Sequence, residues 1–232
     1  MAGRMGPVRL RLFTQPNRGA GAARNRAVAA ATGTWLAFLD ADDEWLPTKI
    51  ERSLAVCEAE GLAMASHDLW NVAPDGGETY NDSHARWARD PADPYRTLFL
   101  RGFISSSTVL VRRDLVVAAG GFDETLRSAQ DYELWLAVLA RADGRFRTFA
   151  EPLLRYTLAP AGITSRIGRK VACSLAILDR HMGVLRRHRP AGPVARLVLL
   201  RLLVIHYEAV QGFRAQGRPL AALGALLPLP WR

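Results

Sequence analysis

The sequence contains few cysteines, and this scarcity narrows what the chain can be. Its 232 residues include two cysteines, Cys57 and Cys173, which lie far apart and match no metal-ligand spacing. We therefore expect neither a disulfide framework nor a cysteine zinc site, and a reduced, cytoplasmic compartment is the simpler prediction. The first residues also lack an apolar stretch long enough for a signal peptide.

Long hydrophobic runs are missing as well. The strongly apolar segment 194–205 (VARLVLLRLLVI) is 12 residues long and contains Arg196 and Arg201, so it is too short to span a membrane. Two interpretations stay open for this segment. It is either a helix packed on the rest of the chain or in a homo-oligomer, or an interfacial helix that attracts anionic lipid.

Acidic residues are scarce in one part of the chain. The whole sequence has a net charge of +9, and between Arg166 and Arg201 nine Lys and Arg residues face a single acid, Asp179. That segment alone carries +8, so any basic partner surface is expected to be C-terminal. No aromatic platform or binding motif accompanies the charge, and nucleic-acid binding is not expected.

What the sequence does contain is enough apolar residues, 49%, to bury a sizeable core. Strand-like and helix-like patterns alternate in its first half, which predicts an α/β layer fold. The run 35–39 is continuously apolar and predicts a buried strand of a parallel sheet. The other expected elements are strands at 8–13, 65–72 and 104–111, an extended segment at 146–156, and helices at 20–32, 131–142 and from residue 170 onward.

Acidic residues follow the predicted strand 35–39 directly. Asp40 and Asp42 are two residues apart, so on extended backbone both side chains point to the same side. Carboxylates in that arrangement suit Mg²⁺ or Mn²⁺, which prefer a few carboxylates together with phosphate oxygens. The alternative is a solvated acidic turn that caps the helix expected after Pro47.

A glycine-containing loop precedes this cluster by one predicted helix. Gly19 lies where the loop meets the helix, and backbone N–H groups at such a point can bind phosphate. Arg24, about one turn into the helix, could bind a diphosphate or a base. The alternative is a plain helix start with a surface arginine.

Several motifs together resemble the family 2 glycosyltransferases of the GT-A fold. The resemblance covers roughly residues 8–165. It rests on Asn17-Arg18-Gly19, Arg24-Asn25, the run from Phe38 to Pro47 with Asp40-Ala41-Asp42-Asp43, Gly120-Gly121-Phe122-Asp123-Glu124, and Gln130-Asp131-Tyr132-Glu133. The resemblance implies a Rossmann-like mixed sheet flanked by helices. It divides the chain into a partial catalytic domain, 1–165, and a basic, amphipathic helical extension, 166–232.

The resemblance also implies roles for individual residues. The family's D-x-D segment holds a divalent cation, Mg²⁺ or Mn²⁺, on the nucleotide diphosphate, and it maps onto Asp40 and Asp42. The general base maps onto Asp131, where the helix N-terminus is expected to keep the carboxylate ionised. The nucleotide-sugar would also contact Asn17, Gly19 and Arg24.

Two departures from the family pattern concern residue 130 and the front of the chain. The family usually has Glu before the base, and this chain has Gln130. The motifs of the family's first two strands are missing, so segment 8–13 would correspond to its third strand. We expect a fragment, a sequence with a wrongly set start codon, or a degenerate member.

The implied function is sugar transfer in cell-surface polysaccharide synthesis. A nucleotide-sugar would be the donor and a saccharide or lipid-linked molecule the acceptor, with inversion, in the cytoplasm or at the inner face of the membrane. The alternative is a non-catalytic remnant that acts as an interaction or membrane-surface module.

Overall fold

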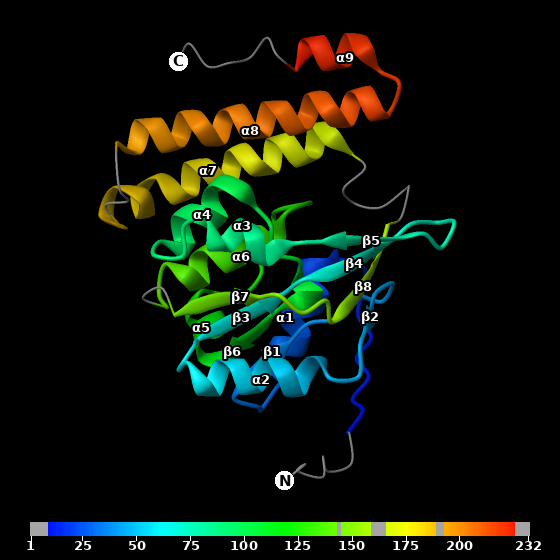
Figure 1. Ribbon diagram of the computed structural model, residues 1–232, viewed down its shortest axis with the longest axis vertical. Helices are drawn as coiled ribbons and strands as arrows, with labels where there is room; N and C mark the ends of the chain where they lie inside the picture. The colour runs from blue at the N-terminus through cyan, green and yellow to red at the C-terminus, as the bar shows by residue number, and fades with distance from the viewer. Residues whose placement is uncertain (1–8, 143–144, 159–165, 189–192, 226–232) are drawn as a thin grey trace.

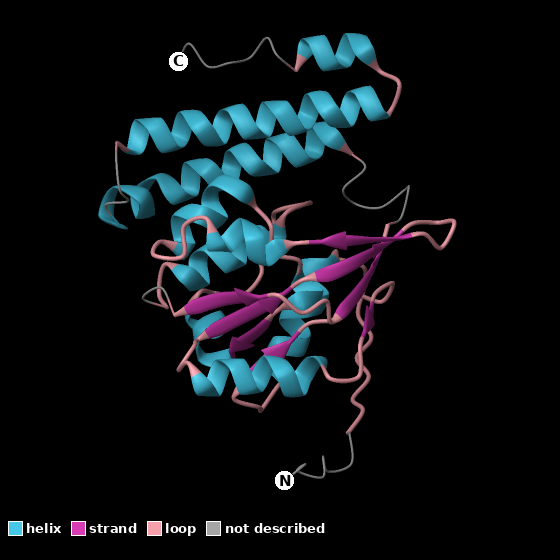
Figure 2. Ribbon diagram, in the orientation of Figure 1, coloured by secondary structure: helices cyan, strands magenta, loops and turns pink. Residues whose placement is uncertain are grey.

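A mixed α/β body and a group of C-terminal helices make up the molecule (Figure 1). The computed structural model describes residues 9–142, 145–158, 166–188 and 193–225. Strands occupy the middle of the body, and helices lie on both sides of them (Figure 2). The α/β prediction, with a mixed sheet flanked by helices, is confirmed.

The strands form two four-stranded sheets. In the first sheet the order is β1-β6-β3-β7, and only β3 and β7 are parallel. In the second the order is β2-β8-β4-β5, and only β4 and β8 are parallel. The strands are β1 (Trp35–Ala37), β2 (Glu44–Trp45), β3 (Met64–His67), β4 (Leu69–Val72), β5 (Glu78–Asn81), β6 (Leu110–Arg112), β7 (Phe146–Phe149) and β8 (Leu154–Thr157).

The chain passes from one sheet to the other at Asp68, between β3 and β4. Its backbone N–H donates to the carbonyl of Phe149 at 3.3 Å, so pairing with the neighbouring segment continues through the break. The buried carboxylate accepts hydrogen bonds from the Tyr80 hydroxyl at 2.5 Å and from the His84 N–H at 2.7 Å. Because both carboxylate oxygens have donors, this buried acid is accommodated without a cation.

Helices cover both faces of the first sheet. On one face, α2 (Lys49–Ala59) closes a small core that includes Cys57, Ala65 and Phe149. On the other face a larger core surrounds Trp135, which is fully buried. The remaining helices of the body are α1 (Ala20–Ala30), α3 (Ser83–Ala88), α4 (Pro94–Arg101), η1 (Ser106–Thr108), α5 (Arg113–Ala118) and α6 (Gln130–Leu139).

The C-terminal helices are α7 (Ile167–His188), α8 (Val194–Ala215) and α9 (Pro219–Gly224). They lie together at the end of the molecule away from the N-terminus (Figure 1). The prediction of helical structure from residue 170 onward is thereby confirmed for the described part. Within the described residues, no helix has the length and apolar character needed to cross a membrane.

Three strand predictions were wrong in whole or in part. Of segment 104–111 only residues 110 and 111 lie in a strand, β6, and residues 106–108 form η1. Residues 9–13 form no strand, and Leu10 is 92% exposed, so the alternating pattern there reflects no sheet face; residue 8 lies outside the described residues. The run 35–39 shortens to β1, which pairs antiparallel with β6 and has no second neighbour among the described strands. Its burial alternates because successive side chains point to opposite faces, Leu36 into the larger core and Trp35 and Ala37 toward the smaller one.

Candidate active site

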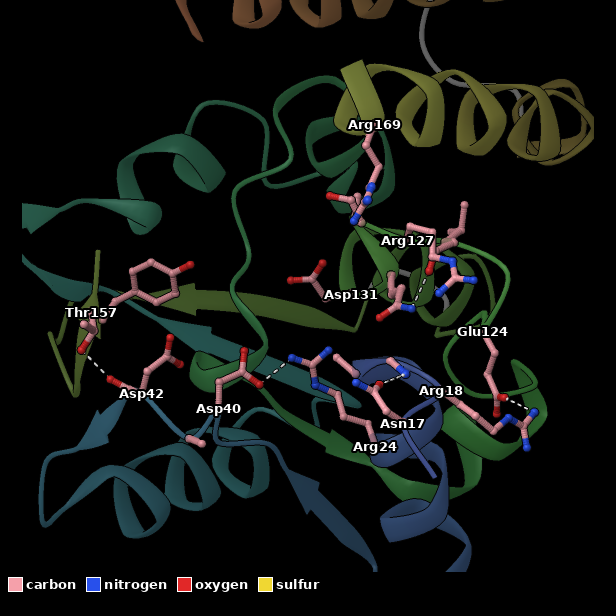
Figure 3. Close-up of a pocket in the computed structure, with 18 of the residues that line it drawn as sticks. Asn17, Arg18, Arg24, Asp40, Asp42, Glu124, Arg127, Asp131, Thr157 and Arg169 are labelled. Carbon is pink, nitrogen blue, oxygen red and sulfur yellow. Dashed lines mark hydrogen bonds and ion pairs between the residues drawn. The ribbon is translucent and has the colours of Figure 1, made fainter. Parts of the chain in front are cut away.

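Asp40 and Asp42 follow β1 in a tight turn. The backbone N–H of Asp43 donates to the carbonyl of Asp40 at 3.1 Å and closes that turn. Both aspartate side chains lie on the side of the turn that faces Asp131 (Figure 3). The prediction that they share one side is therefore met, but by a turn and not by the extended backbone from which it was argued.

Buried Ser107 holds the turn in place through two hydrogen bonds. Its hydroxyl accepts from the Asp40 N–H at 3.1 Å and donates to the Asp43 carboxylate at 2.6 Å. Asp43 also accepts from the Thr157 N–H on β8 at 3.2 Å. Burial raises the pKa of Asp43, although the Ser107 and Thr157 hydrogen bonds oppose the shift. Asp43 thus holds the loop in place, and the carboxylates of Asp40 and Asp42 are not used in these contacts.

The N-terminus of α1 forms another wall. Gly19 has φ of +89°, a conformation that side-chain-bearing residues rarely adopt, and its N–H donates to Asn17 Oδ1 at 3.0 Å. The helix begins at Ala20, so the N–H groups of its first turn lack intrahelical acceptors. An anion is the favoured ligand at such a position.

Arg24 lies one turn into α1 and points to the aspartate turn. Its Nη2 atom donates to Asp40 Oδ1 at 2.5 Å, and its guanidinium lies 5.3 Å from the centre of the Phe122 ring. The side chain is 19% exposed. Arg24 is therefore a cation fixed beside the carboxylates, where it can also reach an anionic ligand.

Asn25 joins two motifs that are far apart in the sequence. Its side-chain amide accepts from the Phe122 N–H at 2.7 Å and donates to the Phe122 carbonyl at 2.8 Å. The space is tight, because a Cβ at Gly121 would lie 2.6 Å from Asn25 Oδ1. Arg18 adds an ion pair to Glu124 at 2.8 Å. The two motifs therefore form one structural unit beside the pocket.

Asp131 lies in the first turn of α6. Ala129, just before this helix, has φ of +58° and is the only non-glycine residue with positive φ among the described residues. Such strain persists where the surroundings enforce it, and it often marks functional sites. The carboxylate accepts from the Tyr132 N–H at 2.9 Å and, weakly, from the Ser106 hydroxyl at 3.5 Å.

Burial is the largest influence on the pKa of Asp131. Desolvation raises its pKa, while the Tyr132 N–H and the nearby Arg24 lower it by less. Burial therefore opposes the effect expected of the helix N-terminus, which was to keep this carboxylate ionised. A carboxylate with a raised pKa is a better proton acceptor once it is ionised.

All six residues predicted from the sequence line one cavity of about 900 Å³. Asn17, Gly19 and Arg24 come from the α1 region, Asp40 and Asp42 from the turn after β1, and Asp131 from α6 (Figure 3). Segments up to 114 residues apart thus meet in a single pocket. A pocket with carboxylates, an arginine and a helix N-terminus can bind an anionic ligand and accept a proton from a hydroxyl.

Sequence reasoning missed further lining residues, among them Arg127, Tyr156 and Arg169. Arg127 stands four residues before Asp131, so its proximity could have suggested it. Tyr156 is the last residue of the expected extended segment and belongs to no motif. Arg169 was counted only as part of the basic C-terminal charge, yet its side chain extends from α7 into the pocket (Figure 3).

The residues fit a divalent cation only as a partial ligand set. Among the described residues, no three His, Cys, Asp or Glu side chains gather as a metal cluster. Asp42 makes no side-chain ion pair there, whereas Asp40 is bonded to Arg24. Two carboxylates suffice for Mg²⁺ or Mn²⁺ when phosphate oxygens and water complete the shell, so the donor set fits a cation that arrives with a diphosphate.

The chain is similar to known glycosyltransferases. The model of glycosyl transferase family 2 matches residues 4–117. The succinoglycan biosynthesis protein ExoO of Rhizobium meliloti is 35% identical over 137 residues, which cover 53% of this chain and 38% of that protein. The amylovoran biosynthesis glycosyltransferase AmsB of Erwinia amylovora is 32% identical over 168 residues, covering 69% of this chain and 54% of AmsB. The chain therefore spans about half the length of these curated relatives or less.

A solved structure has the same fold. Residues 1–349 of TarS from S. aureus superpose with a TM-score of 0.60 at 17% identity, over 91% of this chain and 61% of that one. A second TarS structure, in complex with UDP-GlcNAc, gives 0.59 at 16% identity, over 94% and 64%. At this level of identity the likeness establishes the GT-A fold alone.

Proposed function

Because the chain belongs to glycosyl transferase family 2, we propose that it moves a sugar from a nucleotide-diphosphate-sugar donor to a saccharide or lipid-linked acceptor. Relatives named for succinoglycan, amylovoran and teichuronic acid biosynthesis support a role in polysaccharide synthesis. The TarS complex with UDP-GlcNAc supports a nucleotide-sugar donor. The observation that carries the proposal is the meeting of Asp131, Asp40 and Asp42 with the α1 N-terminus in one cavity.

In the proposed reaction, the acceptor hydroxyl oxygen attacks the anomeric carbon of the donor. The bond from that carbon to the diphosphate oxygen breaks, and its electron pair leaves with the nucleoside diphosphate. The hydroxyl proton passes to the carboxylate of Asp131, whose raised pKa suits it to accept. One direct displacement inverts the configuration at the anomeric carbon.

The leaving diphosphate needs positive charge around it. Asn17, Gly19 and Arg24 would orient it against the first turn of α1. A bound Mg²⁺ or Mn²⁺, held by Asp42 and Asp40, would supply further positive charge as a Lewis acid. Arg24 holds Asp40 in place in this structure, where the two side chains are paired at 2.5 Å.

The proposed division of the chain into a catalytic domain, 1–165, and an extension, 166–232, needs one qualification. Arg169 belongs to the extension but lines the pocket. The extension therefore contributes to the site. We place the reaction in the cytoplasm, with the extension at the inner face of a membrane, and homo-oligomer formation as the alternative use of these helices.

Donor binding and turnover test the proposal separately. Calorimetry with a panel of nucleotide-sugars and Mn²⁺ should show binding by the wild-type chain and by Asp131→Asn, and much weaker binding by Asp42→Ala. Release of nucleoside diphosphate should require Asp131. A folded chain that binds no donor would instead favour a non-catalytic interaction module.

A further inference from the structure

An exposed apolar stripe runs along α8. Leu199, Leu200, Leu203 and Tyr207 are all exposed, Leu203 to 44% and Tyr207 to 64%. Their spacing of three, four and seven residues is that of one helix face. No described element covers this face, and the helix lies at the outer end of the molecule (Figure 1).

The opposite face fixes how α8 is turned. Leu197 belongs to the main core, Ile205 and Ala209 are buried beside α7, and Arg201 is buried as well. The Arg201 guanidinium donates to the Leu100 carbonyl at 3.3 Å and lies 4.7 Å from the centre of the Tyr132 ring. Because these contacts point inward, the exposed stripe cannot turn toward the body without breaking them.

The short helix α9 extends the apolar surface. His206 on α8 is hydrogen-bonded through Nδ1 to the Ala225 carbonyl at 2.8 Å, which ties the end of α9 to α8. On α9, Leu220 is 82% exposed and Leu223 is 60% exposed. The sequence after α9 continues as LLPLPWR, again apolar, with Trp231 and a terminal arginine. Tryptophan and arginine are typical of membrane–water interfaces.

The charges around the stripe have one sign. Arg196 and Arg214 are exposed on the same face as Leu203, one toward each end of α8, and Arg218 is exposed just before α9. The only acid of α8, Glu208, is paired with Lys170 at 2.9 Å. Exposed leucines with flanking arginines complement a surface that is apolar inside and negatively charged outside.

Much of the basic charge expected to form a partner surface is used within the molecule. Lys170 pairs with Glu208, Arg180 pairs with Asp123, Arg201 points inward and Arg169 lines the pocket. Arg166, Arg186 and Arg187 of the same segment are exposed as well, and Arg196 is the exposed cation of the segment that flanks the α8 stripe.

We propose that the outward face of α8 and α9 lies on an anionic lipid surface. Its contact residues are Leu199, Leu200, Leu203, Tyr207, Leu220 and Leu223, with Arg196, Arg214 and Arg218 at the lipid phosphates. The α7 helix packs against α8, and its Arg169 lines the pocket, so α8 and α7 would lie between the pocket and the membrane. A lipid-linked acceptor could reach the pocket from there. This last step rests on the proposed function, whereas the lipid contact does not.

Vesicle binding tests the contact without any substrate. The full chain is sedimented with vesicles of phosphatidylcholine alone, or with one quarter phosphatidylglycerol, at about 0.1 M salt. We expect binding that prefers the anionic vesicles. The double variant Leu199→Gln/Leu203→Gln should bind these vesicles at least about tenfold more weakly than wild type does. Val117→Gln, on an equally exposed apolar residue of α5, should bind as wild type does.

Charge and self-association complete the test. Replacing Arg196, Arg214 and Arg218 by Gln should abolish the preference for anionic vesicles while circular dichroism stays unchanged. The proposal is overturned if wild type does not bind vesicles, or if the leucine variant binds equally well. It is also overturned if the leucine variant dissociates an oligomer in sedimentation while neither protein binds lipid, because the face would then be an interface between copies.

Discussion

The guanidinium of Arg24 is hydrogen-bonded to the carboxylate of Asp40 at 2.5 Å, although the two residues belong to different motifs. This contact holds the N-terminal turn of α1 against the turn that follows β1. Arg24 also lowers the pKa of Asp131, against the larger effect of burial. One arginine therefore connects the proposed diphosphate site to the proposed base.

The first prediction follows from that connection. Arg24→Gln removes a positive charge that favours ionised Asp131, so the pKa of Asp131 should rise further. Because the base acts in its ionised form, the acidic limb of the kcat/KM profile should move to higher pH. Arg18→Gln is the matched control, since Arg18 pairs with Glu124 and does not contribute to the Asp131 shift. Equal profiles for Arg24→Gln and wild type would refute the coupling.

The second prediction concerns Asp131 itself. Asp131→Asn keeps the shape of the side chain but cannot accept the proton, so kcat should fall by about 10²–10⁴-fold. Donor affinity, measured by calorimetry, should change little. Wild-type activity should decline as pH falls through the raised pKa of Asp131, at higher pH than for a solvent-exposed aspartate. Activity of the variant within a few-fold of wild type would rule out this base.

The third prediction concerns the cation. Mn²⁺ should bind more tightly when a nucleoside diphosphate is present, because Asp42 and Asp40 provide only part of its shell. Asp42→Ala should lose that gain in calorimetry. Asp75→Ala, in the exposed turn between β4 and β5, is the control and should keep it. A gain that survives in Asp42→Ala would mean that the cation is held elsewhere.

The fourth prediction concerns Asn25. Asn25→Ala leaves the N–H and the carbonyl of Phe122 without their side-chain partner, so it should cost roughly 2–4 kcal/mol of unfolding free energy. Urea denaturation measures this loss. Asn71→Ala, on β4 away from the two motifs, should cost far less. A small loss at Asn25 would show that the two motifs do not depend on this amide.

The fifth prediction concerns buried Lys49. Desolvation lowers its pKa from 10.5 to about 7, although its ammonium donates to the Val109 carbonyl at 3.0 Å. Between these values the unfolded chain binds more protons, so stability should rise with pH from about 7 to 10.5. Lys49→Met should remove that rise, which amounts to about 3–5 kcal/mol of unfolding free energy at most. Urea midpoints across this pH range would measure it, and an unchanged slope would contradict the assignment.

The elements and the candidate residues could largely be predicted from the sequence. The apolar run before Asp40 and the helical patterns at 20–32 and from residue 170 onward are local. Their periods depend on neighbours only a few residues away. The motif residues Asn17, Gly19, Arg24, Asp40, Asp42 and Asp131 all line one cavity because the fold brings their segments together.

Other features depended on contacts between distant segments. The alternation at 9–13 resembles a strand, but a strand needs a partner, and no described strand pairs with it. The antiparallel pairing of β1 could not be predicted for a similar reason, because a strand's own composition does not indicate the direction of its neighbour. The turn at Asp40 is held by Ser107. The two residues are 67 positions apart, so no local sequence pattern predicts this contact.

The sequence by itself determined the composition of the site: two aspartates after an apolar run, a glycine before a helix, and a later aspartate at a helix start. It also determined that residues 166–201 are basic, because charge is a sum over residues. Only the tertiary structure decided where each charge points. Arg169 faces the pocket, Arg201 faces the core, and Arg196 faces outward, because the packing of α8 on α7 and the body sets the rotation of each helix.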